Sequence, residues 1–163
     1  GWMHSGDIAE VDTDGFYKIT DRIKDIIITA GSKNVAPIMI EGFLKEAPLI
    51  SQAVVYGDRK KYLTALITLD QAELARVAGL LGIRDGLSYQ ELCAHPKIRD
   101  VVKEIVAEKN KKLASFESVK DFAILDRDFT IQEGYLTPTM KIKRRKIYHD
   151  YGGILDALYP QEG

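Results

Sequence analysis

Three things that the sequence lacks already narrow its function. Cys93 is the single cysteine, so no disulfide can form within the chain, and a lone thiol fits a reducing compartment. No apolar run approaches the roughly 20 residues that a membrane-spanning helix needs. The formal net charge is -1, so no overall charge draws the chain to nucleic acid or to an anionic membrane. Any such attraction must come from a local cluster of charges.

The composition is that of a folded domain. Apolar residues make up 45% of the 163 residues and charged residues 29%, which predicts a packed core rather than disorder. The length suits one domain, or one domain with a short piece of another. Because the chain starts within motif-like sequence, at Gly1-Trp-Met-His4, we expect it to be a piece of a larger protein.

Residues 1–29 are predicted to form β structure. Segments 8–11 and 16–19 flank the sequence DTDG, and Asp-Gly between short apolar segments is a strong hairpin signal. Residues 25–29, DIIIT, are β-branched and apolar, as expected of a buried strand. The polar residues at 31–34 then predict a loop.

A helix and a strand pair are expected next. Pro37 suits the first turn of a helix, which we expect to end near Ala47. Segments 50–56 and 63–69 have the composition of strands, and the polar residues between them are typical of a turn. Strands joined by a tight turn favour an antiparallel pair.

The second half of the chain is mainly helical by pattern. Helices are expected at 71–81, at 89–93 and from Pro96 to about Leu113. The last of these is the clearest, since its apolar residues recur at helical spacing on one face. Those residues are Ile98, Val101, Val102, Ile105 and Val106. A short strand at 122–125 and two closing helices, at 144–148 and 154–159, complete the prediction.

These elements predict an α+β domain. We expect a small, largely antiparallel β-sheet flanked by helices and preceded by a β-hairpin. Cys93 is expected to be a small core residue within this domain.

Three short segments contain the residues best suited to chemistry. They are GWMHSGD at 1–7, DRIKDIIITAGSKNVAP at 21–37 and LTPTMKIKRRK at 136–146. Alone, each has an ordinary explanation. Ser-Gly-Asp is a common turn, and the charges of the second segment fit a solvated cluster that contributes little to stability. The cations from Lys141 onward suit an exposed helix face or a patch for phosphate. No aromatic side chain is interleaved with them before Tyr148, so nucleic acid is not an expected partner.

Order and spacing make the three segments much more specific together. They resemble the adenylate-forming superfamily of acyl-CoA synthetases, luciferases and peptide-synthetase adenylation domains. The amino-acid sequences of the second and third segments are most similar to the long-chain acyl-CoA synthetase branch. The resemblance covers nearly the whole chain, and 70–120 is its least diagnostic part. It implies that residues 1–21 are the tail of a large N-terminal AMP-binding domain and that residues 22–163 form the mobile C-terminal domain.

The resemblance also implies a two-step reaction. A fatty carboxylate first attacks the α-phosphate of ATP, giving acyl-AMP and pyrophosphate, and coenzyme A then displaces AMP to give the thioester. ATP with Mg²⁺ and coenzyme A are therefore expected as substrates, with the magnesium ligands in the large domain. No tightly bound cofactor is expected in this fragment, which would not catalyse the full reaction alone. No metal site is expected either, since His4, His95 and His149 are isolated and Cys93 lacks the paired spacing of a zinc site.

The resemblance assigns roles to residues near the first two motifs. Asp7 matches the aspartate that binds the ribose hydroxyls of the nucleotide. A carboxylate can accept hydrogen bonds from both hydroxyls. Arg22 matches the arginine that contacts ribose and phosphate. Lys24 matches the hinge about which the C-terminal domain rotates between the two half-reactions.

The third motif contains the expected catalytic lysine. Lys141 matches the lysine of the first half-reaction, where an ammonium group neutralises the attacking carboxylate and the α-phosphate. Lys143, two residues further on, is the rival candidate. Lys141 is preferred because 137–145 then aligns without a gap with the family pattern Thr-x-Ser-Gly-Lys-x-x-Arg-Arg. Here Thr139 and Met140 stand where most members have Ser-Gly.

The loop formed by Gly31, Ser32, Lys33 and Asn34 is a weaker assignment by resemblance. It would face coenzyme A in the second half-reaction, with Gly31 permitting close approach of the pantetheine arm. The expected partners are the large N-terminal domain of the same chain, a fatty acid, ATP and coenzyme A. The expected location is the cytoplasm, with peripheral membrane association of the parent left open. Two other hypotheses stay open: a ligase for another carboxylic acid, and a non-catalytic α+β module that binds phosphate through residues 141–146.

Overall fold

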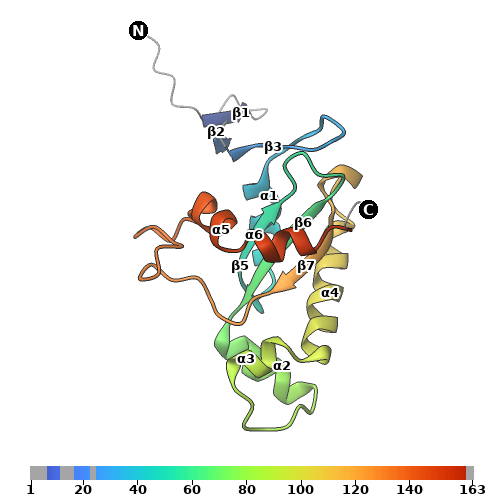
Figure 1. Cartoon of the computed structure of the whole chain (residues 1–163), viewed down its shortest axis with the longest axis vertical. Helices are drawn as coiled ribbons and strands as arrows, with labels where there is room; N and C mark the ends of the chain where they lie inside the picture. Colours follow the sequence, from blue (N-terminus) through green and yellow to red (C-terminus); the bar gives the residue numbers. More distant parts are fainter. Residues whose placement is uncertain (1–6, 12–16, 23–24, 161–163) are drawn as a thin grey trace.

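A three-stranded sheet lies at the centre of the fold (Figure 1). The computed structural model describes residues 7–11, 17–22 and 25–160. Strand β6 (Leu63–Leu69) is the middle strand, between β5 (Ile50–Tyr56) and β7 (Val119–Ile124). β5 pairs with β6 antiparallel, as predicted, whereas β7 pairs with β6 in parallel. A parallel neighbour requires a long crossover connection, which the helices between β6 and β7 supply.

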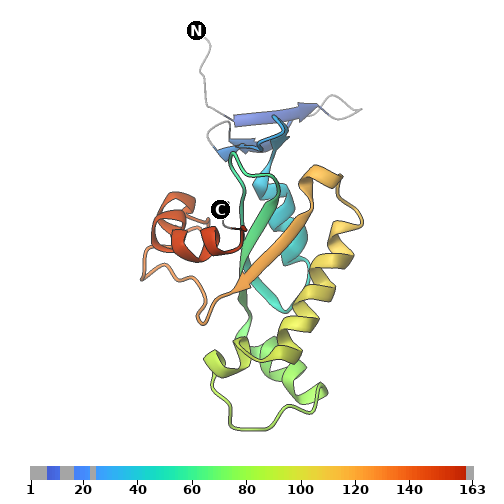
Figure 2. The same cartoon turned by 45° about the vertical axis from the view of Figure 1, so that its right-hand side comes forward.

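Helices cover both faces of this sheet. Helices α1 (Pro37–Lys45) and α4 (Pro96–Asn110) lie on one face, and α5 (Arg144–Asp150) and α6 (Gly152–Ala157) lie on the other (Figure 2). Helices α2 (Gln71–Leu80) and α3 (Tyr89–Cys93) lie at one end of the sheet. A short 3₁₀ helix, η2 (Ser115–Glu117), precedes β7.

The two helical layers explain why β6 is buried without interruption. All seven of its residues are buried, including Thr64 and Thr68. Successive side chains of a strand point to opposite faces, so all of them are buried when both faces are covered. Leu66 belongs to the core cluster beneath α5 and α6, with Val54, Ile147 and Leu155. The alternate residues of β6 belong to the other cluster, beneath α1 and α4. Those residues are Leu63, Ala65, Ile67 and Leu69.

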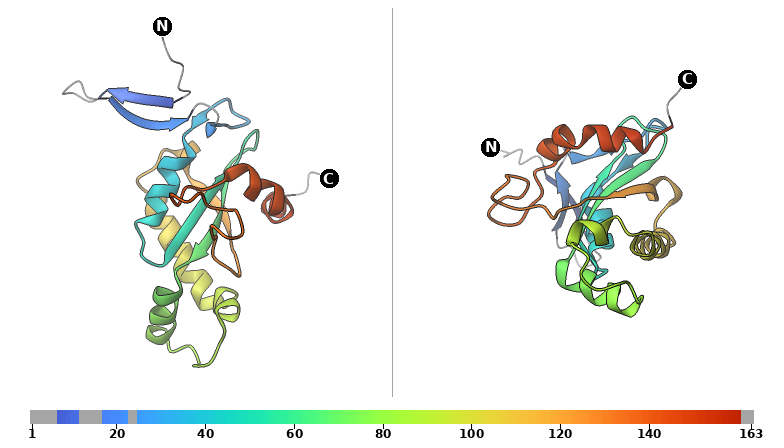
Figure 3. Two further views of the ribbon diagram at one scale, coloured as in Figure 1. Left: turned by 90° about the vertical axis from the view of Figure 1, so that its left-hand side faces the viewer. Right: turned by 60° about the horizontal axis from the view of Figure 1, so that its bottom comes forward.

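Two small hairpins precede α1. Strands β1 (Asp7–Val11) and β2 (Tyr17–Arg22) pair antiparallel, as predicted, and lie at the end of the molecule opposite α2 and α3 (Figure 3). Strands β3 (Ile27–Ile28) and β4 (Asn34–Val35) form the second hairpin. Three of the four strand pairs in the described part of the chain are therefore antiparallel. The α+β class and the preceding hairpin are confirmed.

Several boundaries differ from the prediction. The segment 25–29 is not a continuous buried strand, because β3 contains only two residues and Ile28 is 50% exposed. Only one face of this short strand is covered, so Ile27 and Thr29 are buried whereas Ile28 between them is exposed. Helix α4 ends at Asn110 rather than near Leu113. The Asn110 side-chain amide donates to the carbonyl oxygen of Val119 and accepts from its N–H, which turns the chain into β7.

Cys93 is 5% exposed and belongs to the core, as predicted. Its helix, α3, begins with a capping box in which Ser88 and Glu91 each accept a hydrogen bond from the other's backbone N–H. None of the helices in the described ranges is long and apolar enough to cross a membrane.

The burial of β6 on both faces predicts the stability of a core variant. Leu66→Ala should lower the free energy of unfolding by about 2–5 kcal/mol, because Leu66 is fully buried and its removal leaves a cavity. Leu80→Ala, at a position 74% exposed in α2, should change it by less than about 0.5 kcal/mol. Chemical denaturation of the two variants measures the difference, and equal losses would contradict the layered core.

Candidate functional site

The segment from Leu136 to Ile142 forms a tight, closed turn. Leu136 and Ile142 form an isolated antiparallel bridge, and the Thr137 N–H donates to the Lys141 carbonyl oxygen at 2.8 Å. The Thr137 hydroxyl oxygen accepts from the Lys141 N–H at 3.0 Å. The backbone and side chain of Thr137 therefore both fix the backbone of Lys141. This explains in local terms why the motif begins with a threonine.

Met140 adopts an unusual backbone conformation within this turn. Its φ is +63°, in the left-handed region that glycine adopts most easily. The N–H of Met140 donates to the Thr137 carbonyl oxygen at 2.8 Å, and its side chain is 55% exposed. The family pattern that this segment resembles has glycine at this position. A left-handed turn fits glycine well, since glycine has no Cβ to strain.

Both candidate lysines lie at the surface. Lys141 and Lys143 have exposed side chains. Lys143 is also the N-cap residue of α5, and its N–H donates to the Tyr135 carbonyl oxygen at 2.8 Å. The two lysines thus differ in setting. Lys141 lies within the closed turn, whereas Lys143 begins the helix that follows.

Arg144, the first residue of α5, forms a buried ion pair with Glu41 of α1. Two guanidinium nitrogens donate to the two carboxylate oxygens, at 2.5 Å and 2.9 Å. The side chains are 11% and 6% exposed, and this is the most buried ion pair in the described ranges. Burial by itself lowers the pKa of Arg144, but the hydrogen bonds and charge of Glu41 outweigh it and raise that pKa. Arg144 therefore stays charged.

The loop of Gly31, Ser32, Lys33 and Asn34 is the tip of the β3–β4 hairpin. All four residues are exposed. The Ser32 N–H donates to the Thr29 carbonyl oxygen at 2.9 Å, and Ser32 has a φ of +57°. The turn is further held by the connection between β5 and β6, where Asp58 accepts from the Ile28 N–H at 3.1 Å.

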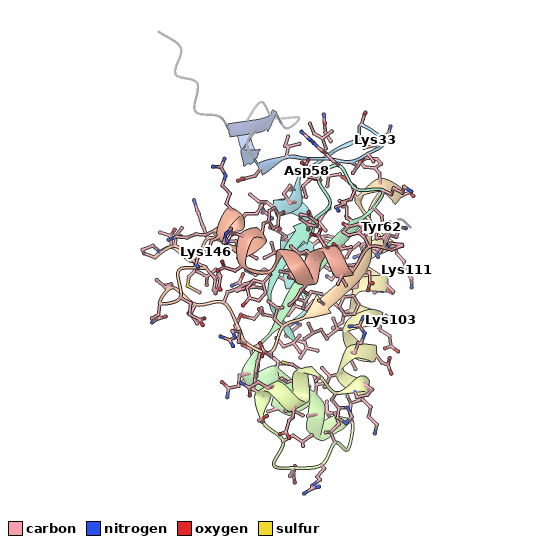
Figure 4. All side chains as sticks on the ribbon, in the orientation of Figure 1. Lys33, Asp58, Tyr62, Lys103, Lys111 and Lys146 are labelled. Carbon is pink, nitrogen blue, oxygen red and sulfur yellow. The ribbon has the colours of Figure 1, made fainter. Side chains whose placement is uncertain are left out.

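The two candidate surfaces lie on different sides of the molecule. Figure 4 shows Lys33 at the end that carries the β3–β4 hairpin, close to Asp58. Lys146, in the helix that follows the Lys141 turn, projects from another side. The ribbon segment that leads into α5 and contains the Lys141 turn lies away from the β3–β4 hairpin (Figure 1), so the structure does not bring residues 31–34 and Lys141 together into one site.

The first two motifs are only partly described. Asp7 and Arg22 are Cα partners in the register of the β1–β2 hairpin, so the backbone places these two sequence-predicted residues opposite each other. Lys24 lies outside the described residues. Within the ranges that the structure describes, no group of three or more histidine, cysteine, aspartate or glutamate residues is arranged to hold a metal ion.

Sequence reasoning missed Glu41. An isolated glutamate on an amphipathic helix is usually a solvated residue, and its partner is 103 positions away. One available signal was its position among the apolar residues of the helix, between Ile40 and Leu44, both of which are buried. That pattern places a carboxylate on the core side of α1, where it requires a partner.

The chain belongs to the family of the AMP-binding enzyme C-terminal domain, whose family model matches residues 24–163. A long-chain-fatty-acid–CoA ligase of Mycobacterium tuberculosis is 41% identical over 162 residues, covering 99% of this chain and 27% of that protein. One from Homo sapiens is 36% identical over 184 residues, covering 99% and 25%. The chain thus spans about a quarter of the length of these relatives.

Solved structures show the same fold. The adenylation domain of a carboxylate reductase from Mycobacterium chelonae matches with a TM-score of 0.77 and 26% identity, covering 95% of this chain and 22% of that one. The corresponding domain from Segniliparus rugosus, in complex with AMP and a co-purified carboxylic acid, matches with a TM-score of 0.72 and 28% identity. That match covers 98% of this chain and 23% of the other. The predicted relationship to adenylate-forming enzymes is confirmed.

The conformation of Met140 leads to a stability prediction. Met140→Gly should leave the free energy of unfolding unchanged or raise it by up to about 1 kcal/mol, since glycine avoids the steric cost of a left-handed residue. Met140→Val should lower it by about 1 kcal/mol or more, because a β-branched residue fits this region poorly. Denaturation curves of the three chains test this. A glycine variant as unstable as the valine variant would contradict the left-handed assignment.

Proposed function

We propose that this chain is the C-terminal part of a long-chain fatty-acid–CoA ligase. The parent enzyme activates a fatty acid with ATP, giving acyl-AMP and pyrophosphate, and then transfers the acyl group to coenzyme A with release of AMP. The observation that carries this proposal is the 41% identity to a long-chain-fatty-acid–CoA ligase over 99% of the chain. Since the chain spans only 27% of that relative, the fragment alone does not catalyse the reaction.

In this proposal Lys141 acts in the first half-reaction. Its ammonium group lies between the fatty carboxylate and the α-phosphate of ATP, where it offsets the negative charge that both reactants carry. Little covalent chemistry is required of the protein, so the position of this charge decides the rate. The closed turn supports the assignment, since it fixes the backbone of Lys141 through two hydrogen bonds from and to Thr137.

The nucleotide and the hinge belong to the start of the chain. Residues 1–21 are the tail of the large AMP-binding domain, and residues 22–163 are the mobile C-terminal domain. Asp7 accepts hydrogen bonds from the ribose hydroxyls, and Arg22 contacts ribose and phosphate. Lys24 is the hinge about which the domain rotates between half-reactions. The pairing of Asp7 with Arg22 supports their joint role, because both then lie at the same end of the hairpin.

The loop 31–34 faces coenzyme A after that rotation. Its separation from Lys141 supports a division of the two half-reactions between two faces of one rotating domain. ATP enters with Mg²⁺, whose ligands belong to the large domain, and coenzyme A enters as the second substrate. The parent works in the cytoplasm, and its long-chain substrates favour peripheral contact with a membrane surface.

A second candidate is a ligase for a different carboxylic acid. The structures reported above are carboxylate reductase domains rather than fatty-acid ligases. Because the acid-binding pocket lies in the large domain, this chain would serve either acid with the same residues. Comparing acids of different length and aromatic acids in the full-length parent decides between the two.

The catalytic role of Lys141 is testable in the full-length parent. Lys141→Ala should lower ATP–pyrophosphate exchange by on the order of 100-fold or more, since it removes the charge at the reacting phosphate. Thioester formation from supplied acyl-AMP should stay within about twofold, because that step uses the other face of the domain. Lys143→Ala is the matched control, with both rates near those of the wild type. Unchanged rates in Lys141→Ala would favour a non-catalytic phosphate-binding module.

The role of the hairpin tip is tested by Gly31→Val. A Cβ at Gly31 meets no atom within 4 Å except the Thr29 hydroxyl oxygen at 3.9 Å, so the fold has room for a side chain. The variant should therefore keep its thermal stability and its pyrophosphate exchange. Thioester formation should fall by about tenfold or more, because the added side chain meets the pantetheine arm from outside the chain. Wild-type thioester formation would show that this loop does not approach coenzyme A.

A further inference from the structure

The Glu41–Arg144 pair joins the two helical layers across the outer edge of the sheet. β5 is an edge strand, so one side of its backbone has no strand partner. At Val55 this side is satisfied from both helical layers: the N–H donates to Glu41 at 2.8 Å, and the carbonyl oxygen accepts from the Tyr148 hydroxyl at 2.5 Å. Arg144 also reaches that carbonyl, at 3.5 Å. The pair thus joins α1, β5 and α5 at one point.

The same point determines where the Lys141 turn lies. Residues 137–142 hydrogen-bond to one another within the turn, and the outer residues Pro138 to Lys141 are exposed. Leu136 and Ile142, at the base of the turn, pack in the core cluster beneath α5 and α6, but these apolar contacts do not set a direction as a bidentate pair does. Arg144 follows Lys141 by three residues and is the first residue after it with a buried polar contact to another layer.

We propose that Glu41 and Arg144 are positioning residues that aim Lys141 at the reacting phosphate in the adenylate-forming step. This inference rests on the catalytic role proposed for Lys141. A bidentate pair fixes the plane and direction of the guanidinium group as well as its distance. The start of α5 is thereby held at one orientation, and the turn that leads into it is held with it.

The chemistry of the pair fits a role in geometry better than a role in stability. Burying two charges costs desolvation energy, so a buried ion pair is often no more stabilising than apolar residues of similar size. An apolar contact between α1 and α5 would stabilise the layers equally well. It would not fix a direction, however, since it lacks the two parallel hydrogen bonds.

The test measures both half-reactions in the full-length parent with Glu41→Gln. Glutamine keeps the size of glutamate and an acceptor for the Val55 N–H, but it removes the charge that pairs with Arg144. We expect ATP–pyrophosphate exchange to fall by on the order of tenfold to a hundredfold, as expected for a misplacement near 1 Å. The loss should be in kcat, with KM for ATP unchanged. Thioester formation from supplied acyl-AMP should stay within about twofold.

Glu46→Gln is the matched control. Glu46 likewise forms an ion pair, with Lys109 at 2.6 Å. That pair joins the end of α1 to α4, and the Glu46 side chain is 56% exposed. The same substitution there should leave both half-reactions at wild-type rates. Equal loss of both half-reactions in Glu41→Gln, or loss of neither, would overturn the positioning role.

A double variant separates position from stability if Glu41→Gln folds poorly. Glu41→Leu with Arg144→Met replaces the charges by an apolar contact, which should restore folding. We expect it to melt near the wild-type temperature and still to lose exchange selectively. Recovery of wild-type exchange would overturn the proposal. Lys141→Ala in the same assay distinguishes failure of the catalytic proposal from failure of the positioning proposal. Wild-type pyrophosphate exchange in Lys141→Ala would refute the catalytic role of Lys141. Reduced exchange in Lys141→Ala together with wild-type exchange in Glu41→Gln would refute only the positioning role.

Discussion

The fold depends on the burial of β6 on both faces. A strand that is buried on both sides must be covered on both sides, so helices lie above and below it. α1 and α4 cover one face, and α5 and α6 cover the other. The hairpin tip at residues 31–34 precedes α1 in one layer, and the Lys141 turn precedes α5 in the other. The two helical layers therefore carry the two candidate surfaces on different sides of the sheet.

This separation fits the role in two half-reactions that we propose for the domain. The hairpin tip at residues 31–34 leads into α1, whereas the Lys141 turn leads into α5 on the other layer. A rigid domain with two distinct surfaces can present one and then the other by rotation, without any change in its core. The Glu41–Arg144 pair is the place where the layers meet around the sheet edge. It therefore keeps the Lys141 surface in a fixed relation to the hairpin surface.

Local signals predicted much of the fold. The periodic face of α4, the proline at its start and the turn between β5 and β6 are short-range features, and each was predicted close to its observed position. Ile28 shows where such signals fail. Its β-branched, apolar neighbourhood suggested a buried strand, but burial depends on what covers a residue, and Ile28 is half exposed. The parallel pairing of β7 was equally out of reach, because a long crossover leaves no turn signal.

The sequence by itself determined the family, the order of the three motifs and the identity of Lys141 as the residue to test. Those conclusions need only residue types and spacing, which are local information. Tertiary structure alone decided that Glu41 is buried against Arg144, that Met140 is left-handed and that the two candidate surfaces lie apart. The first and third depend on contacts between residues far apart in the chain, and the second depends on the hydrogen bonds that close the turn around Met140. A pattern of neighbouring residues does not encode them.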